Sequence, residues 1–178
     1  MPRYIALFDS IRVGAKRLTM AELRAALEAE GFSNVETVVA GGNLLVDHDE
    51  RPDEGLEEKL GLMLRHRFGM QGVALVRSRA SLAAAIDGNP FAAEGEEDFV
   101  HTLFLDGSVN PEAFARLESG RQGVERLAMG DRALHIDYVS GGAEGKQVAA
   151  FVERRLGRRG TARSLRSMKR MLAKMDAV

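Results

Sequence analysis

The spacing of hydrophobic residues changes twice early in the chain, and each change marks a new element. A short apolar run at 3–8 is typical of a buried strand. Apolar residues then recur at helical spacing, after a Thr19–Glu22 pair that fits a capping box and before Gly31, which suits a left-handed helix stop. This part of the chain therefore predicts a strand, a loop and a capped helix.

The next segment predicts a hairpin, a second helix and a further strand. β-branched residues at 35–40 and the run at 43–48 are typical of paired strands, and Gly41-Gly42 fits the two-residue turn between them. Apolar residues at helical spacing predict a helix over 53–68, and 72–77 is typical of a fourth strand. The resulting order, β-α-β-β-α-β, is that of a split βαβ or ferredoxin-like unit.

The second half of the chain has a similar outline, although no sequence identity between the halves is evident. The elements predicted there are a helix at 81–86, a turn at 88–91, a strand at 100–105, a helix after Pro111, a hairpin around Gly130, a strand at 133–138, and helices at 146–156 and 162–174. We therefore expect an α+β protein of two ferredoxin-like subdomains, 1–78 and 79–178. Their sheets should be mostly antiparallel, and an amphipathic basic helix should lie at the C-terminal end.

The direction of the chain predicts where two loops meet. If the first strand runs up, the loop at 9–18 lies at the top, the helix runs down and the second strand runs up again. The Gly41-Gly42 turn then also lies at the top. The first loop and this turn are therefore expected to be neighbours.

Composition excludes several classes of site. The chain of 178 residues is 45% hydrophobic and 29% charged, which is typical of a soluble globular protein. It contains no cysteine, so disulfides, thiolate nucleophiles and cysteine-based metal sites are excluded. The apolar run from Ile5 to Phe8 is too short for a secretory core or a membrane span. We expect a cytoplasmic protein with no membrane partner.

Charge is divided unevenly along the chain. The net charge is −1, but residues 154–174 hold seven arginines and two lysines without an acidic residue, which leaves 16 basic against 26 acidic side chains elsewhere. This segment favours an amphipathic helix that packs on an acidic body and exposes a cationic face. The alternative is a nucleic-acid surface that contacts phosphates. The residues of that surface would be Arg163, Arg166, Lys169, Arg170 and Lys174.

Several motifs resemble a large bacterial family known only as domain of unknown function family 1697. The residues that carry the resemblance are Tyr4–Leu7, Ile11, Val13, Gly14, Lys16, Met20–Arg24, Gly31-Phe32, Gly42-Asn43, Asn89-Pro90-Phe91 and His101–Leu105. The resemblance covers nearly the whole chain. It implies two ferredoxin-like halves and no established activity.

The departures from that family fall on polar positions of its motifs. They are Asp9, Ser10, Arg12, Ala15 and Gly41, together with Ser164, Leu165 and Arg166 near the end of the chain. The residues around them keep the family pattern. The resemblance therefore implies a retained scaffold, in which the usual ligand of the family could be replaced by another or lost.

The first loop and the glycine turn are the leading candidate site. The hypothesis is a binding domain for a small anionic or phosphorylated ligand, which would use backbone amides, the helix start at Thr19 and nearby cations. Its residues would be Arg12, Gly14, Lys16, Gly42 and Asn43, with Arg163 added if the last helix folds back to this end. The alternative is an ordinary β–α loop with surface cations.

Catalytic chemistry has little support in the sequence. The stretch Ser140–Lys146 fails the spacing of a phosphate-binding P-loop at both ends, and no nucleophile motif is present. The histidines at 48, 66, 101 and 135 lack metal-ligand spacing. We expect no cofactor, no metal and no catalytic residue; an enzyme acting on a phosphorylated metabolite is a third hypothesis.

Overall fold

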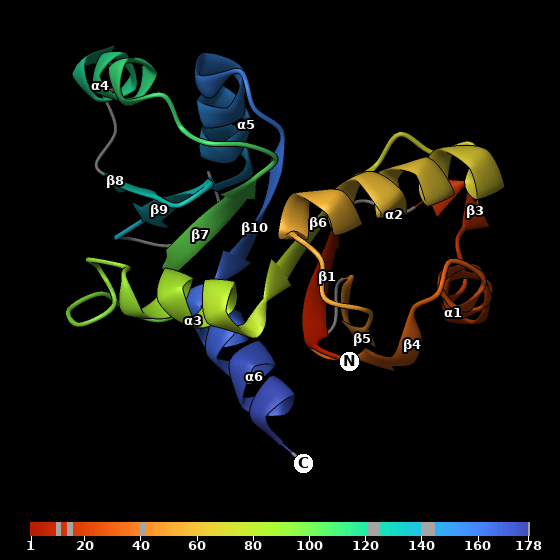
Figure 1. The fold of residues 1–178 in the computed structure, drawn as a ribbon. Helices are drawn as coiled ribbons and strands as arrows, with labels where there is room; N and C mark the ends of the chain where they lie inside the picture. Colours follow the sequence, from red (N-terminus) through yellow and green to blue (C-terminus); the bar gives the residue numbers. More distant parts are fainter. Residues whose placement is uncertain (10–11, 14–15, 40–41, 121–124, 140–144, 178) are drawn as a thin grey trace. The chain divides into compact units, whose positions relative to one another are not determined.

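A computed structural model describes residues 1–9, 12–13, 16–39, 42–120, 125–139 and 145–177. The chain divides into two compact units, one of Met1–Ser81 with Arg170–Val178 and one of Leu82–Lys169. Each unit has a four-stranded antiparallel sheet and helices (Figure 1). The predicted α+β class is confirmed.

The first unit contains a sheet with β1 at an inner position. Its elements are β1 (Arg3–Asp9), β2 (Arg12–Val13), β3 (Lys16–Arg17), α1 (Met20–Ala29), β4 (Ser33–Thr37), β5 (Asn43–Asp47), α2 (Asp53–Phe68) and β6 (Val73–Ser78). The strand order is β4-β5-β1-β6, and every neighbouring pair is antiparallel. The short strands β2 and β3 form a separate two-stranded ladder inside the predicted loop.

Alternate residues of β1 face the two helices of the first unit. Tyr4, Ala6 and Phe8 belong to one buried cluster with Leu27 of α1 and Leu60 of α2. The period of two in the strand and the apolar stripes of the helices therefore meet in one core. This core fixes the start of β1, where Tyr4 lies.

The second unit repeats the strand order of the first. Its elements are β7 (Val100–Leu105), α4 (Pro111–Gly120), β8 (Arg126–Gly130), β9 (Ala133–Asp137), α5 (Gly145–Leu156) and β10 (Gly160–Ser164). Their order in the sheet, β10-β7-β9-β8, is that of β6, β1, β5 and β4 in the first unit. The inward residues of this sheet pack with Leu117 of α4 and Val152 of α5.

Two predicted boundaries are wrong. Residues 162–164 were assigned to the last helix but belong to β10, which pairs antiparallel with β7 from Gly160 to Ser164; α6 (Leu165–Asp176) begins only afterwards. Backbone pairing with β7 outweighs the helical spacing of the following residues at this point. The strand predicted over 35–40 is β4, at Ser33–Thr37, and the chain beyond it has a left-handed residue at Val39, with φ of 49°.

A pair of serines makes the same contacts at a strand-to-helix junction in each unit. In the first unit Ser78 Oγ accepts from Ser81 N at 3.1 Å and contacts Ser81 Oγ at 3.0 Å, where β6 leads into α3 (Arg79–Asp87). In the second unit Ser164 Oγ makes the same two contacts with Ser167, at 3.1 and 3.0 Å. An arginine precedes each first serine. The halves thus share a short Arg-Ser-x-x-Ser motif, which the sequence comparison of the halves missed.

Candidate functional site

The first predicted site lies partly outside the described residues. Gly14 is not among them, and Arg12 and Lys16 are described only as members of β2 and β3. The backbone register places Arg12 opposite Arg17 and Val13 opposite Lys16. The loop at the end of β1 is therefore a short ladder that carries three basic residues.

Gly42 has a structural reason to be glycine. Its carbonyl accepts from Phe8 N at 2.8 Å, so the end of β1 lies beside this turn, as the direction of the chain predicts. Its φ is 89°, and a Cβ atom at this position would lie 2.8 Å from the Phe8 carbonyl oxygen. Close approach of two backbones therefore excludes a side chain at Gly42.

Asn43 is a buried residue that holds the same turn. Its side chain is 3% exposed, and Nδ2 donates to the Val39 carbonyl at 3.0 Å. Backbone bonding continues at Val38 N, which donates to Asn43 O at 3.1 Å. The amide of Asn43 thus satisfies the carbonyl of a left-handed residue, which is a structural role.

The start of α1 already carries its own cap. Thr19 Oγ1 accepts from Glu22 N, and the Glu22 carboxylate accepts from Thr19 N, both at 3.1 Å. The predicted capping box is confirmed. Since it engages an amide and places a carboxylate at this helix end, the attraction of α1 for an anion is reduced.

Arg163 belongs to the second unit and lies on β10. Its Nη1 donates to Thr161 Oγ1 at 2.6 Å and to the Ala162 carbonyl at 2.9 Å. The guanidinium therefore supports the strand on which it lies. Its membership of the predicted anion site stays a prediction.

The basic C-terminal segment is met by carboxylates within each unit. Three of the five cations proposed for nucleic-acid binding form ion pairs: Arg166 with Asp98 at 2.6 Å, Lys169 with Glu97 at 2.7 Å and Lys174 with Glu36 at 2.9 Å. The guanidinium of Arg166 has its pKa raised by the hydrogen bond and charge of Asp98. These contacts favour the interpretation of α6 as a helix bound to acidic residues of its own chain.

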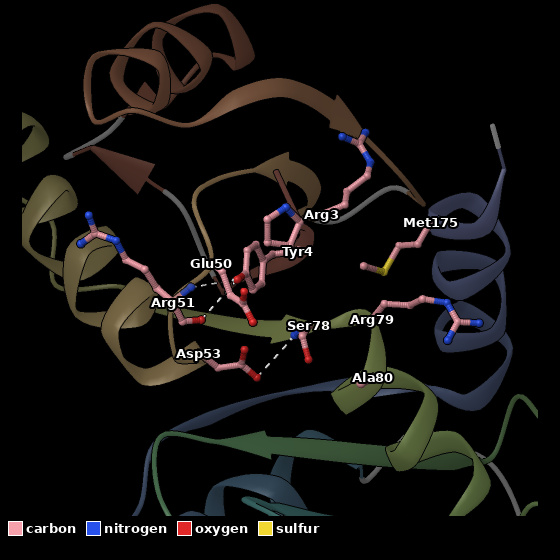
Figure 2. Close-up of a pocket in the computed structure, with 10 residues that line it drawn as sticks. Arg3, Tyr4, Glu50, Arg51, Asp53, Ser78, Arg79, Ala80 and Met175 are labelled. Carbon is pink, nitrogen blue, oxygen red and sulfur yellow. Dashed lines mark hydrogen bonds between the residues drawn. The ribbon is translucent and has the colours of Figure 1, made fainter.

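A hollow of 590 Å³ lies in the first unit (Figure 2). Its walls come from the start of β1, the segment before α2, the end of β6 with the start of α3, and the end of α6. The lining residues are Pro2, Arg3, Tyr4, Glu50, Arg51, Asp53, Ser78, Arg79, Ala80 and Met175. This volume is within the range of small-molecule sites.

One wall of the hollow is polar and fixed by hydrogen bonds. Tyr4 Oη donates to the Arg51 carbonyl and accepts from Arg51 N, both at 3.2 Å, so the segment before α2 is tied to β1. Asp53 Oδ2 accepts from Ser81 Oγ at 3.1 Å and from Ser78 N at 3.4 Å. The start of α2 and the start of α3 are therefore held together by this carboxylate.

The arginines of the hollow direct their charge elsewhere. Arg3 pairs with Glu36 and Asp47, each at 2.8 Å. Arg79 pairs with Asp176 of α6, and this contact lowers the pKa of that carboxyl. In Figure 2 the guanidinium groups of Arg3, Arg51 and Arg79 point away from the centre, whereas Glu50 and Met175 extend toward it.

The hollow lies at the opposite end of β1 from the predicted loop. Arg3 and Tyr4 begin this strand, and Asp9 ends it beside the predicted site. Sequence reasoning missed the hollow because four segments far apart in the chain line it. A usable signal was present in Ser78, the last residue of β6, and Ser81, in the first turn of α3, which stand at cap spacing.

His135 is buried and His101 is half-buried. His135 is 2% exposed, its Nδ1 lies 2.9 Å from Thr102 Oγ1, and burial lowers its pKa to about 4. Burial also lowers the pKa of His101. Within the described part of the chain, no group of three or more histidine, aspartate or glutamate side chains could hold a metal ion.

No described helix is both long and apolar enough to cross a bilayer.

Among solved structures, the chain is similar to the conserved bacterial protein SP0830 from Streptococcus pneumoniae, with a TM-score of 0.73, 21% identity and 99% of each chain covered. At this identity the likeness shows the fold alone. No curated protein matches significantly. A family model described as protein of unknown function, DUF1697, matches residues 1–135.

Proposed function

Since this chain belongs to the DUF1697 family of proteins of unknown function, we propose from its geometry that it is a binding domain for a small molecule, with the ligand in the hollow of the first unit. The observation that carries this proposal is the pairing of a fixed polar wall, at Tyr4, Asp53 and Ser78, with an open volume of 590 Å³. A few placed polar groups beside apolar surface are typical of ligand sites.

The two walls of the hollow differ in chemistry, which favours binding of a specific ligand over non-specific adsorption. Ala80 and Met175 provide apolar surface opposite the polar wall, and both belong to helices. Side chains on helices that are tied by hydrogen bonds and ion pairs are held in place before a ligand arrives. The wall at Met175 is fixed through Asp176, which pairs with Arg79.

A thermal-shift and NMR screen of primary metabolites tests the proposal. We expect at least one ligand to raise the melting temperature and to shift the backbone amides of Tyr4, Ser78 and Arg79. Replacing the exposed Ala80 by tryptophan should fill the hollow and abolish this response, whereas Ala84→Trp, on the same helix outside the lining, should leave it intact. The proposal is wrong if no ligand is found, or if the response survives in Ala80→Trp.

The anion site at the first loop remains a second candidate. It is favoured by the backbone register of β2 and β3, which brings the basic residues Arg12, Lys16 and Arg17 into one short ladder. Sulfate or phosphate should then raise the melting temperature. An unchanged shift in the Arg12→Ala/Lys16→Ala double variant would contradict this candidate.

A further inference from the structure

The charged groups that point into the hollow are not the same as the charged residues that line it. Counted by residue type, the lining holds three arginines and two acidic residues. Arg3 and Arg79 are committed to ion pairs, and the guanidinium of Arg51 turns outward in Figure 2. The charged side chain that extends toward the centre of the hollow is therefore Glu50.

Glu50 is the group with capacity for a ligand. It is exposed, it extends toward the centre of the hollow, and among the residues that the structure describes none donates a hydrogen bond to its carboxylate. Asp53 is more engaged, since it accepts from Ser78 N and Ser81 Oγ.

The neighbouring helix end does not reverse this preference. A helix start attracts anions, and α2 begins at the hollow. Its first turn, however, carries Asp53 and Glu54, which offset the positive end of the helix dipole. An anionic ligand would therefore meet the carboxylates of Glu50 and Asp53 in the lining, and like-charge repulsion disfavours such a ligand.

We infer that the hollow binds a protonated amine with a short apolar body, an inference that rests on the proposed function of this site. The ammonium would donate to Glu50, because it has three donors and no acceptor. The carbon chain would lie against Met175 and Ala80, which form the apolar wall. Assigned in this way, each wall of the hollow has a matching part of the ligand.

Three four-carbon probes of equal length test the charge preference: 1,4-diaminobutane, butane-1,4-diol and succinate. Titrations followed by ¹⁵N NMR should show binding of the diamine at Glu50, Ser78 and Arg79, several-fold weaker binding of the diol, and none of succinate. Glu50→Gln should weaken binding of the diamine by up to about fivefold, the upper end of the range for an exposed charge pair. Glu58→Gln removes an exposed charge of α2 outside the lining and should change nothing.

The outcomes separate the ligand class from the site. The amine assignment is overturned if the diol or succinate binds as well as the diamine, or if Glu50→Gln has no effect. The site itself survives that result as long as Ala80→Trp still abolishes binding. A diamine that fails to bind at tens of millimolar also overturns the amine assignment. Binding that persists in Ala80→Trp overturns the site itself.

Discussion

The buried imidazole of His135 makes the stability of the protein depend on pH. His135 lies on β9 directly opposite Thr102 of β7, and the two side chains are 2% and 0% exposed. Burial lowers the pKa of His135 to about 4, whereas an unfolded chain should titrate near 6.5. Well above pH 6.5 His135 is neutral in both states and the difference in pKa has no effect. As the pH falls toward 4, the unfolded state gains a proton that the folded state excludes, so the free energy of unfolding decreases.

The size of this effect follows from the difference in pKa. At about 1.4 kcal/mol per pKa unit, the pKa of about 4 corresponds to a loss of about 3 kcal/mol between pH 7 and pH 4. Carboxylates titrate in the same range, so the contribution of His135 must be isolated by comparison with a variant. The double variant His135→Leu/Thr102→Val removes the titrating group and its hydrogen-bond partner together, so neither member of the pair leaves a buried polar atom behind.

Urea denaturation at pH 7, 5.5 and 4 measures the effect. The wild type should lose about 3 kcal/mol more than the double variant across this range, and the His135 ring signals should titrate near pH 4 by NMR. Equal pH dependence in the two proteins, or titration of His135 near 6.5, would refute the reasoning.

Three further expectations concern stability and the basic helix. Gly42→Ala should destabilise the protein by about 1–3 kcal/mol, because φ is 89° and the new Cβ meets the Phe8 carbonyl. Gly55→Ala, where nothing lies within 4 Å of the new Cβ, should be neutral or stabilising, and urea denaturation tests both variants. Arg77→Met should cost about 3–5 kcal/mol by the same assay, since it removes the buried cation that pairs with the half-buried Glu57 carboxylate at 3.0 Å; a loss below 1 kcal/mol would argue against this cost. Fluorescence anisotropy should detect no nucleic-acid binding at physiological salt, because carboxylates already engage Arg166 and its neighbours; tight binding that weakens in Arg166→Ala would revive that hypothesis.

The sequence predicted correctly those elements that a local pattern of residues defines. The apolar stripe of α2 and the capping box of α1 are local signals, and both elements formed as expected. β10 was missed because its residues, Gly160–Ser164, lack apolar alternation and become a strand by pairing with β7. Pairing of this kind depends on residues some sixty positions away, which periodicity cannot register.

The candidate site shows the same limit more strongly. The turn at Gly42 was located correctly from the direction of the chain, but Gly42 and Asn43 proved to have structural roles there. The charge of the hollow depends on which way its arginines point, and carboxylates on other strands and helices direct Arg3 and Arg79. Residue type alone would have assigned that surface to an anion.

The division of the chain into units has a consequence for its synthesis. The first unit is completed by residues 170–178, which leave the ribosome after the entire second unit has been made. Met175 is therefore the last wall of the hollow to be translated, and the Arg79–Asp176 ion pair closes later still. A nascent chain can form the first sheet early, yet it acquires the last wall of the proposed ligand site only after the second unit has been made, so a chain that stops before Met175 would not bind the proposed ligand.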